Sequence, residues 1–101
     1  MFMEIKKTVS GDKLTLTLSG RLDTTSAPEL QEVLIPELEG ANHVELDFAG
    51  LEYVSSAGLR VLLMGSKKAK EKGVNLTLIN VSDDVMEVFE VTGFSGILSI
   101  K

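Results

Sequence analysis

Two short polar segments contain the residues whose types and spacing could do chemistry. The first reads Gly-Arg-Leu-Asp-Thr-Thr over residues 20–25, and the second reads Leu-Glu-Tyr-Val-Ser-Ser-Ala-Gly-Leu over residues 51–59. Each segment leads into the start of a predicted helix, where free backbone amides and the helix dipole favour negative charge. In an open α/β sheet such loops lie beyond the carboxyl ends of the strands, where function collects. Both segments are therefore candidates for a functional site.

The adjacent hydroxyls of Ser55 and Ser56 have a structural interpretation and a functional one. Serine is among the commonest helix N-caps, so spacing alone favours a role in capping over one in chemistry. Gly58 follows within the first turn, where glycine costs about 1 kcal/mol relative to alanine. A glycine there suggests either that a ligand approaches the backbone closely or that a neighbouring element packs tightly against it.

The sequence lacks the residue sets that catalysis requires. The single histidine, His43, precedes a predicted strand and is distant from both segments, so neither serine has a general base. Asp23, Asp47 and Glu52 could approach the serines, but their spacing matches no known cation-binding loop. A glycine-rich phosphate loop with a lysine is also missing. We therefore expect a protein that is not an enzyme and has neither a metal nor a cofactor.

Alternating apolar residues and helix start and stop signals outline the elements that must position these loops. The pattern predicts strands near residues 3–9, 14–18, 44–48, 74–78 and 97–100, the first two joined as a hairpin at Gly11-Asp12, and helices that begin near Ser26, Ser56 and Ser82. Ser26 is expected to form a capping box with Glu29, and Pro36 to kink or end the first helix near Ile35. Residues 50–54 are expected to be a short connection.

This order of elements predicts an α/β fold in a single domain over residues 1–101. Crossovers between successive strands require a mixed, mostly parallel sheet of four to five strands. Each strand has one polar face, so about three helices are expected mainly on one side of the sheet. Leu62 and Leu63 of the second helix are expected in the core, with Gly73 as a left-handed cap at its end.

Composition excludes several classes of partner. The chain has a net charge of −5 and so lacks the basic surface that supplies most nucleic-acid affinity. Its one lysine cluster, residues 67–72, is interpreted as compensating the dipole at a helix end. The longest apolar run is too short to span a bilayer, residues 1–9 are not expected to be a signal peptide because they lack a long apolar run, and the sequence has no cysteine. We expect a cytoplasmic protein without membrane or nucleic-acid partners, and a monomer because of its charge.

The order and spacing of these motifs resemble the STAS domain family, and within it the anti-sigma factor antagonists. The resemblance rests on Gly-Arg-Leu-Asp-Thr-Thr at 20–25, Leu-Asp-Phe at 46–48, Tyr-Val-Ser-Ser-Ala-Gly-Leu at 53–59 and Thr-Gly-Phe at 92–94. It covers essentially the whole chain. The family fold, a mixed sheet with flanking helices, agrees with the pattern derived from the residues.

The resemblance implies a partner switch that regulates transcription. Members bind an anti-sigma factor that is also an ATP-dependent serine kinase, which releases the sigma factor. The kinase phosphorylates the antagonist at the start of the second helix and so ends the interaction, and a metal-dependent serine phosphatase resets it. The partner-binding residues that the resemblance implies are Asp23, Thr24, Ser55, Ser56, Ala57, Gly58 and Leu59.

The acceptor position departs from the family pattern, which usually reads Asp-Ser-x-Gly-Leu. Aligned residue by residue, Ser55 occupies the position of the aspartate and Ser56 that of the acceptor. Some members have a second serine that serves as acceptor, and that position is Ala57 here. Ser56 is therefore the implied phosphorylation site and Ser55 the less favoured one. The alternative function is a STAS module that regulates a transporter or senses a small ligand or nucleotide without phosphorylation.

Overall fold

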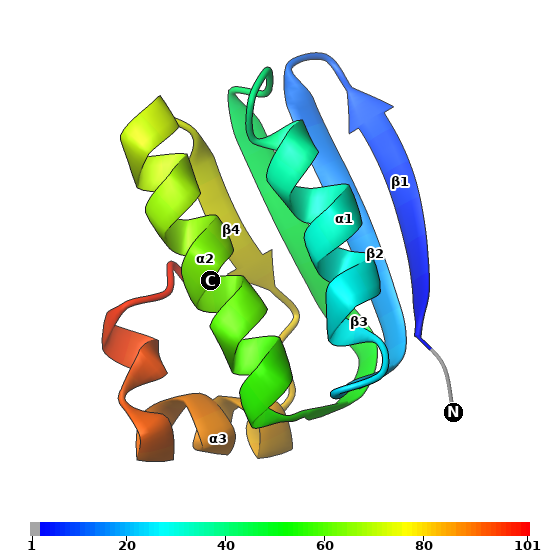
Figure 1. The fold of residues 1–101 in the computed structure, drawn as a ribbon, viewed down its shortest axis with the longest axis vertical. Helices are drawn as coiled ribbons and strands as arrows, with labels where there is room; N and C mark the ends of the chain where they lie inside the picture. Colours follow the sequence, from blue (N-terminus) through cyan, green and yellow to red (C-terminus); the bar gives the residue numbers. More distant parts are fainter. Residues whose placement is uncertain (1–2) are drawn as a thin grey trace.

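The computed structural model describes residues 3–101, which form one mixed sheet with helices on one of its faces (Figure 1). The elements in chain order are β1 (Glu4–Ser10), β2 (Lys13–Leu22), α1 (Ala27–Glu37), β3 (His43–Val54), α2 (Ser56–Lys72), β4 (Asn75–Ile79), α3 (Asp83–Thr92) and the 3-10 turn η1 (Phe94–Gly96).

The sheet has the strand order β1-β2-β3-β4. β1 and β2 form an antiparallel hairpin, whereas β2, β3 and β4 run parallel to one another. α1 and α2 lie along one face of the sheet, and α3 lies beyond the ends of the parallel strands (Figure 1). The predicted α/β class, the mixed sheet and the position of the helices are confirmed.

Side-chain alternation places the core between the sheet and the helices. The buried strand residues are Leu14, Leu16, Leu18, Leu22, Val44, Leu46, Phe48, Leu51, Val54, Leu76 and Leu78. α1 covers them with Leu30, Leu34 and Leu38, and α2 with Leu59, Val61 and Leu62. Phe89 of α3 packs against Phe48, with ring centroids 6.2 Å apart. The intervening strand residues are mostly hydroxyl-bearing or charged and lie on the helix-free face.

β3 is longer than the sequence pattern predicts. Residues 50–54 were expected to be a connection, but they continue the strand by pairing with residues 19–22 of β2. The register shifts twice along this pair, between Thr17 and Ser19 and between Gly20 and Arg21. Gly50 permits the close approach, because a Cβ atom there would lie 2.8 Å from the Ser19 Cβ. A glycine that indicates a turn in the sequence thus marks an irregularity inside a strand.

The ends of several elements also differ from expectation. The predicted last strand is a 3-10 turn followed by a single bridge between Ile100 and Leu78. α1 continues past the expected end at Ile35 to Glu37, with Pro36 inside its last turn. Val9 is 64% exposed, because β1 lies outside the area that α1 covers.

The lysines at the end of α2 have a partner besides the helix dipole. Lys68 and Lys72 contact the two carboxylate oxygens of Glu39 at 2.5 and 3.2 Å, and the hydrogen bond from Lys68 is the main cause of the lowered pKa of Glu39.

Within residues 3–101, every helix is too short or too polar to cross a bilayer.

Replacement of Leu62 by alanine tests the packing of α2 on the sheet. Leu62 is only 1% exposed, so the Leu62→Ala variant should lose about 2–5 kcal/mol of unfolding free energy. Leu63, also expected in the core, is only half-buried, and Leu63→Ala should cost less. Urea denaturation of both variants checks the difference. Equal losses of unfolding free energy in the two variants would contradict an orientation of α2 in which Leu62 faces the sheet and Leu63 does not.

Candidate functional site

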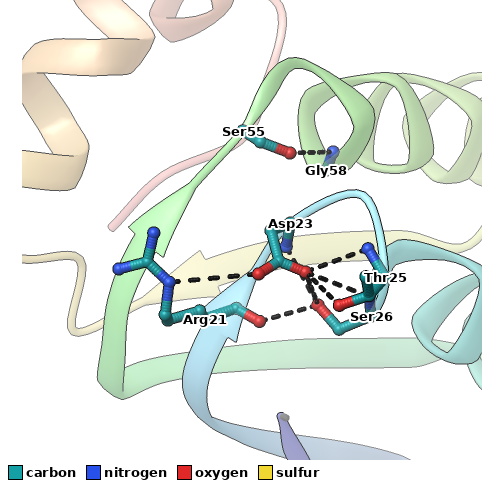
Figure 2. Close-up of polar contacts among 6 residues, drawn as sticks. All are labelled: Arg21, Asp23, Thr25, Ser26, Ser55 and Gly58. Carbon is teal, nitrogen blue, oxygen red and sulfur yellow. Dashed lines mark hydrogen bonds and ion pairs between the residues drawn. The ribbon is translucent and has the colours of Figure 1, made fainter. Parts of the chain in front are cut away.

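The two candidate loops begin side by side at the carboxyl ends of the two central strands, β2 and β3; this end of the sheet is called the site edge below. Leu22 and Val54, the last residues of β2 and β3, are register partners in the parallel pair. The Ser55 N–H then donates to the Leu22 carbonyl at 2.8 Å, one residue beyond the strands. The loop at residues 23–26 and the start of α2 therefore leave the sheet together (Figure 2).

Asp23 organises the first loop by accepting several hydrogen bonds at one oxygen. Its Oδ1 accepts from the Thr25 hydroxyl at 2.7 Å and from the backbone amides of Thr25 and Ser26 at 3.0 and 3.2 Å (Figure 2). The hydrogen bond from the Thr25 hydroxyl is the main cause of a lowered pKa of the Asp23 carboxyl. The charged form of Asp23 thus holds the turn into α1.

Ser26 does not form the capping box predicted with Glu29. It makes no capping hydrogen bond to the amides of α1, which it precedes. Its hydroxyl instead accepts from the Asp23 N–H at 2.9 Å and donates to the Arg21 carbonyl at 2.7 Å. The side chain is buried, at 3% exposure, inside the loop. The Ser26 side chain therefore links the end of β2 to the start of α1. The Asp23 carboxylate accepts from the backbone amides of Thr25 and Ser26, which come just before the helix.

At the start of α2 the two serines take different positions. Ser55 is the N-cap, and its hydroxyl accepts from the Gly58 N–H at 3.4 Å (Figure 2). Ser56 is the first residue of the helix and is exposed. The capping interpretation therefore applies to Ser55, and the hydroxyl of Ser56 is accessible to solvent.

Gly58 allows a neighbouring element to pack tightly against α2, which is one of the two explanations that its position in the sequence suggests. A Cβ atom at this position would lie 2.6 Å from Leu22 Cγ and 3.1 Å from the Leu22 carbonyl oxygen. The first turn of α2 thus rests directly on the end of β2. Gly58 and Leu59 are buried beneath the loop, whereas Thr24 and Ser56 are exposed and Asp23 and Ala57 are half-buried.

The carboxylates considered as a cation site do not form a cluster within residues 3–101. Asp47 Oδ1 accepts from the Ala49 N–H and from the Asn80 amide, both at 3.0 Å. Glu52 is exposed. In the part of the chain that the structure describes, no three metal-ligating side chains come together. His43 begins β3, far along the strand from the two loops, and its Nδ1 lies 3.2 Å from the Asn75 amide nitrogen.

Sequence reasoning missed one pair at the site edge. The Arg21 guanidinium carbon lies 4.2 Å from the centroid of the Tyr53 ring. The two residues are neighbours only because of the register shift between Gly20 and Arg21. Both belong to the segments singled out in the sequence, but no local pattern indicates that they are opposite one another.

Comparison with known proteins identifies the family. The family described as "Mlab, STAS domain" matches residues 5–99. The chain belongs to the STAS domain family. An anti-sigma-B factor antagonist of Staphylococcus epidermidis is 29% identical to this STAS domain over 102 residues, covering 100% of this chain and 94% of the relative. One of Bacillus subtilis is 31% identical over 88 residues, covering 87% and 81%.

Solved structures agree with the STAS fold. An anti-sigma factor antagonist from Mycobacterium paratuberculosis superposes with a TM-score of 0.85 at 16% identity, covering 97% of this chain and 84% of that one. The unphosphorylated form of the anti-sigma factor antagonist SpoIIAA superposes with a TM-score of 0.80 at 17% identity, covering 98% and 87%. The sequence resemblance to the anti-sigma factor antagonists of this family is confirmed.

The hydrogen bond from Thr25 predicts how Asp23 titrates. In Thr25→Val the hydroxyl donor is lost, so the pKa of Asp23 should rise towards its ordinary value, as followed by NMR of the carboxyl carbon. A lowered pKa in the folded state stabilises the fold above the unfolded pKa, and this contribution is lost as pH falls through the folded value. As the pH is lowered, the variant should therefore lose the stabilising contribution of ionised Asp23 at a higher pH than the wild-type protein does. An unchanged midpoint would contradict the assignment.

Replacement of Gly58 by alanine tests the contact with Leu22. The added methyl group must displace Leu22, at a cost of about 1–3 kcal/mol for overpacking, partly offset by up to about 1 kcal/mol of helix propensity. We expect Gly58→Ala to lower the free energy of unfolding. Gly40→Ala is the matched control, because a Cβ atom there meets nothing within 4 Å. A Gly58→Ala variant as stable as the control would refute the close contact.

Proposed function

We propose that this STAS domain is an anti-sigma factor antagonist that binds an anti-sigma factor with serine kinase activity. In this proposal the kinase phosphorylates Ser56 and so ends the interaction, and a metal-dependent serine phosphatase restores it. The domain itself is a cytoplasmic, monomeric binding module without an enzymatic activity of its own. The anti-sigma-B factor antagonists among its relatives support the class of function.

The observation that carries the proposal is the exposed hydroxyl of Ser56 on a rigid support. Ser56 begins a helix of 17 residues whose first turn packs on the end of β2 through Gly58. The neighbouring loop is held by Asp23 and Ser26. A kinase needs an accessible hydroxyl, and a specific interface benefits from a surface that is ordered before binding.

Ser56 is favoured over Ser55 as the acceptor because of their different surroundings. Ser55 is half-buried, and its oxygen caps the helix by accepting from the Gly58 amide. Phosphorylation of Ser55 would require this oxygen to leave its capping position. Ser56 is exposed and can be modified without that rearrangement.

A phosphate on Ser56 would alter binding more than folding. It adds about −1.5 to −2 charge at a helix N-terminus, where the dipole tolerates an anion. The first turn of α2 contains no acidic side chain that would repel it. An interface formed around the neutral loop would lose charge and shape complementarity. The proposed partner surface comprises Asp23, Thr24, Ser55, Ser56, Ala57, Gly58 and Leu59, with the two buried residues supporting it from beneath.

Substitutions at the two serines test the assignment. Ser56→Asp should fold normally but bind the cognate kinase more weakly, since an uncompensated charge at an interface typically costs about 2–5 kcal/mol. Ser56→Ala should bind and incorporate no phosphate from labelled ATP. Ser55→Ala should remain a substrate, although loss of the cap lowers its stability by about 0.5–2 kcal/mol.

Peptide mapping after incubation with the kinase and labelled ATP identifies the acceptor. Label on Ser55 would reject Ser56 as the site. Firm binding of the kinase without any label would reject the phosphorylation step and support a STAS regulator that works without modification. No binding by the wild-type protein would reject the antagonist function and favour regulation of a transporter or sensing of a ligand.

A further inference from the structure

Arg21 and Tyr53 form a stacked pair on the helix-free face of the sheet, next to the two loops. Their chain neighbours Leu22 and Val54 are buried under the helices, at 0% and 4% exposure. Successive strand side chains point to opposite faces, so Arg21 and Tyr53 lie on the other side. The guanidinium carbon is 4.2 Å from the ring centroid, and Tyr53 is 40% exposed.

A β-bulge creates this pair. The register runs from Gly20 opposite Leu51 to Arg21 opposite Tyr53, so Glu52 is skipped. Gly20 accommodates the irregularity with φ of +97°. A regular ladder would place Arg21 opposite Glu52 and favour an internal ion pair. The bulge instead places an aromatic ring beneath the guanidinium, and bulges commonly redirect side chains next to functional sites.

The guanidinium keeps most of its hydrogen-bonding capacity for a ligand. Among residues 3–101, its ion-pair partner within 4 Å is Asp23, with Nε 3.9 Å from Oδ2, which exceeds hydrogen-bond distance. Within the described residues the Arg21 side chain donates no hydrogen bond. Figure 2 shows its two terminal nitrogens turned away from Asp23. Stacking on Tyr53 orients the planar group, while its terminal donors stay open to solvent.

We infer that the Arg21–Tyr53 pair is a binding site for a carboxylate side chain of the partner protein. This inference rests on the proposed function and extends the proposed partner surface from the loops onto the helix-free face. A planar guanidinium binds a carboxylate through two parallel hydrogen bonds, and an orientation set in advance reduces the entropic cost of binding. Arginine and tyrosine are also among the residues that dominate interface energetics.

The partner's carboxylate is a better match than a phosphate on this chain. Ser56, the proposed acceptor, begins α2, which covers one face of the sheet (Figure 1), whereas the Arg21 side chain lies on the opposite, helix-free face. The two groups therefore face different directions from the site edge. The net charge of −5 favours a partner surface that is basic overall. A single acidic residue on that surface, opposite Arg21, would fix the orientation of the complex.

Affinity measurements on the purified cognate kinase test the site. We expect Arg21→Ala and Tyr53→Ala each to weaken binding by about 10- to 100-fold. Arg21→Lys should lose most of the same affinity because an ammonium group cannot form the paired contact. Tyr53→Phe should bind like the wild-type protein, because its ring still supports the guanidinium. The double variant should be less than additive, because Tyr53 acts by orienting Arg21.

Lys6→Ala is the matched control, since Lys6 is an exposed cation that faces the same side of the sheet on β1, two strands from Tyr53. It should bind within about twofold of wild type, and unfolding curves should show all variants folded. If Arg21→Ala binds normally while Ser56→Asp does not, the inference fails and the proposed function stands. If Arg21→Ala changes only the stability of the phosphorylated form, the ligand is the phosphate and the inference fails. If the wild-type protein does not bind the kinase, both fail.

Discussion

The contact between the end of β2 and the first turn of α2 is the constraint on which the site depends. Leu22 is fully buried, its carbonyl accepts the Ser55 N–H, and its side chain occupies the space that a Cβ at Gly58 would fill. Close packing of a helix start on a strand end fixes both the position and the direction of the helix axis. The exposed Ser56 hydroxyl and the Asp23 loop therefore have a defined relative position before any partner binds.

The site edge separates groups that stabilise the loops from groups that are available to a partner. The hydroxyls of Ser26 and Ser55 and the Oδ1 atom of Asp23 make internal hydrogen bonds, and the Thr25 hydroxyl holds the Asp23 pKa low. Ser56 and Arg21 have hydrogen-bonding atoms that face solvent. The proposed phosphate on Ser56 would therefore remove none of these internal hydrogen bonds. This separation is physically suited to a switch that changes association and leaves the domain folded.

The incorrect expectations arise where contacts that the local sequence pattern does not include decide the structure. Gly50 indicates a turn by composition, but β2 supplies a partner along residues 50–54 and the strand continues. Ser26 followed by Glu29 matches a capping box, but the Ser26 hydroxyl instead accepts from the Asp23 N–H and donates to the Arg21 carbonyl. At residues 97–100 the apolar alternation is that of a strand, yet only Ile100 meets β4. For residues 50–54 and 97–100 the deciding strand is distant in sequence, and for Ser26 the deciding partners lie three and five residues before it.

The sequence by itself determined the fold class, the mixed sheet, the order of elements as far as α3 and the bounds of α2, because hydrophobic periodicity and helix caps are local properties of the chain. It also indicated both loops of the site and Gly58 as a position of close approach. Only the tertiary structure decided that Ser55 is the cap and Ser56 the exposed hydroxyl, that Leu22 is the neighbour of Gly58, and that Arg21 stacks on Tyr53. These features depend on the register between β2 and β3, which includes two irregularities, and a shift of one residue changes every pair that follows it.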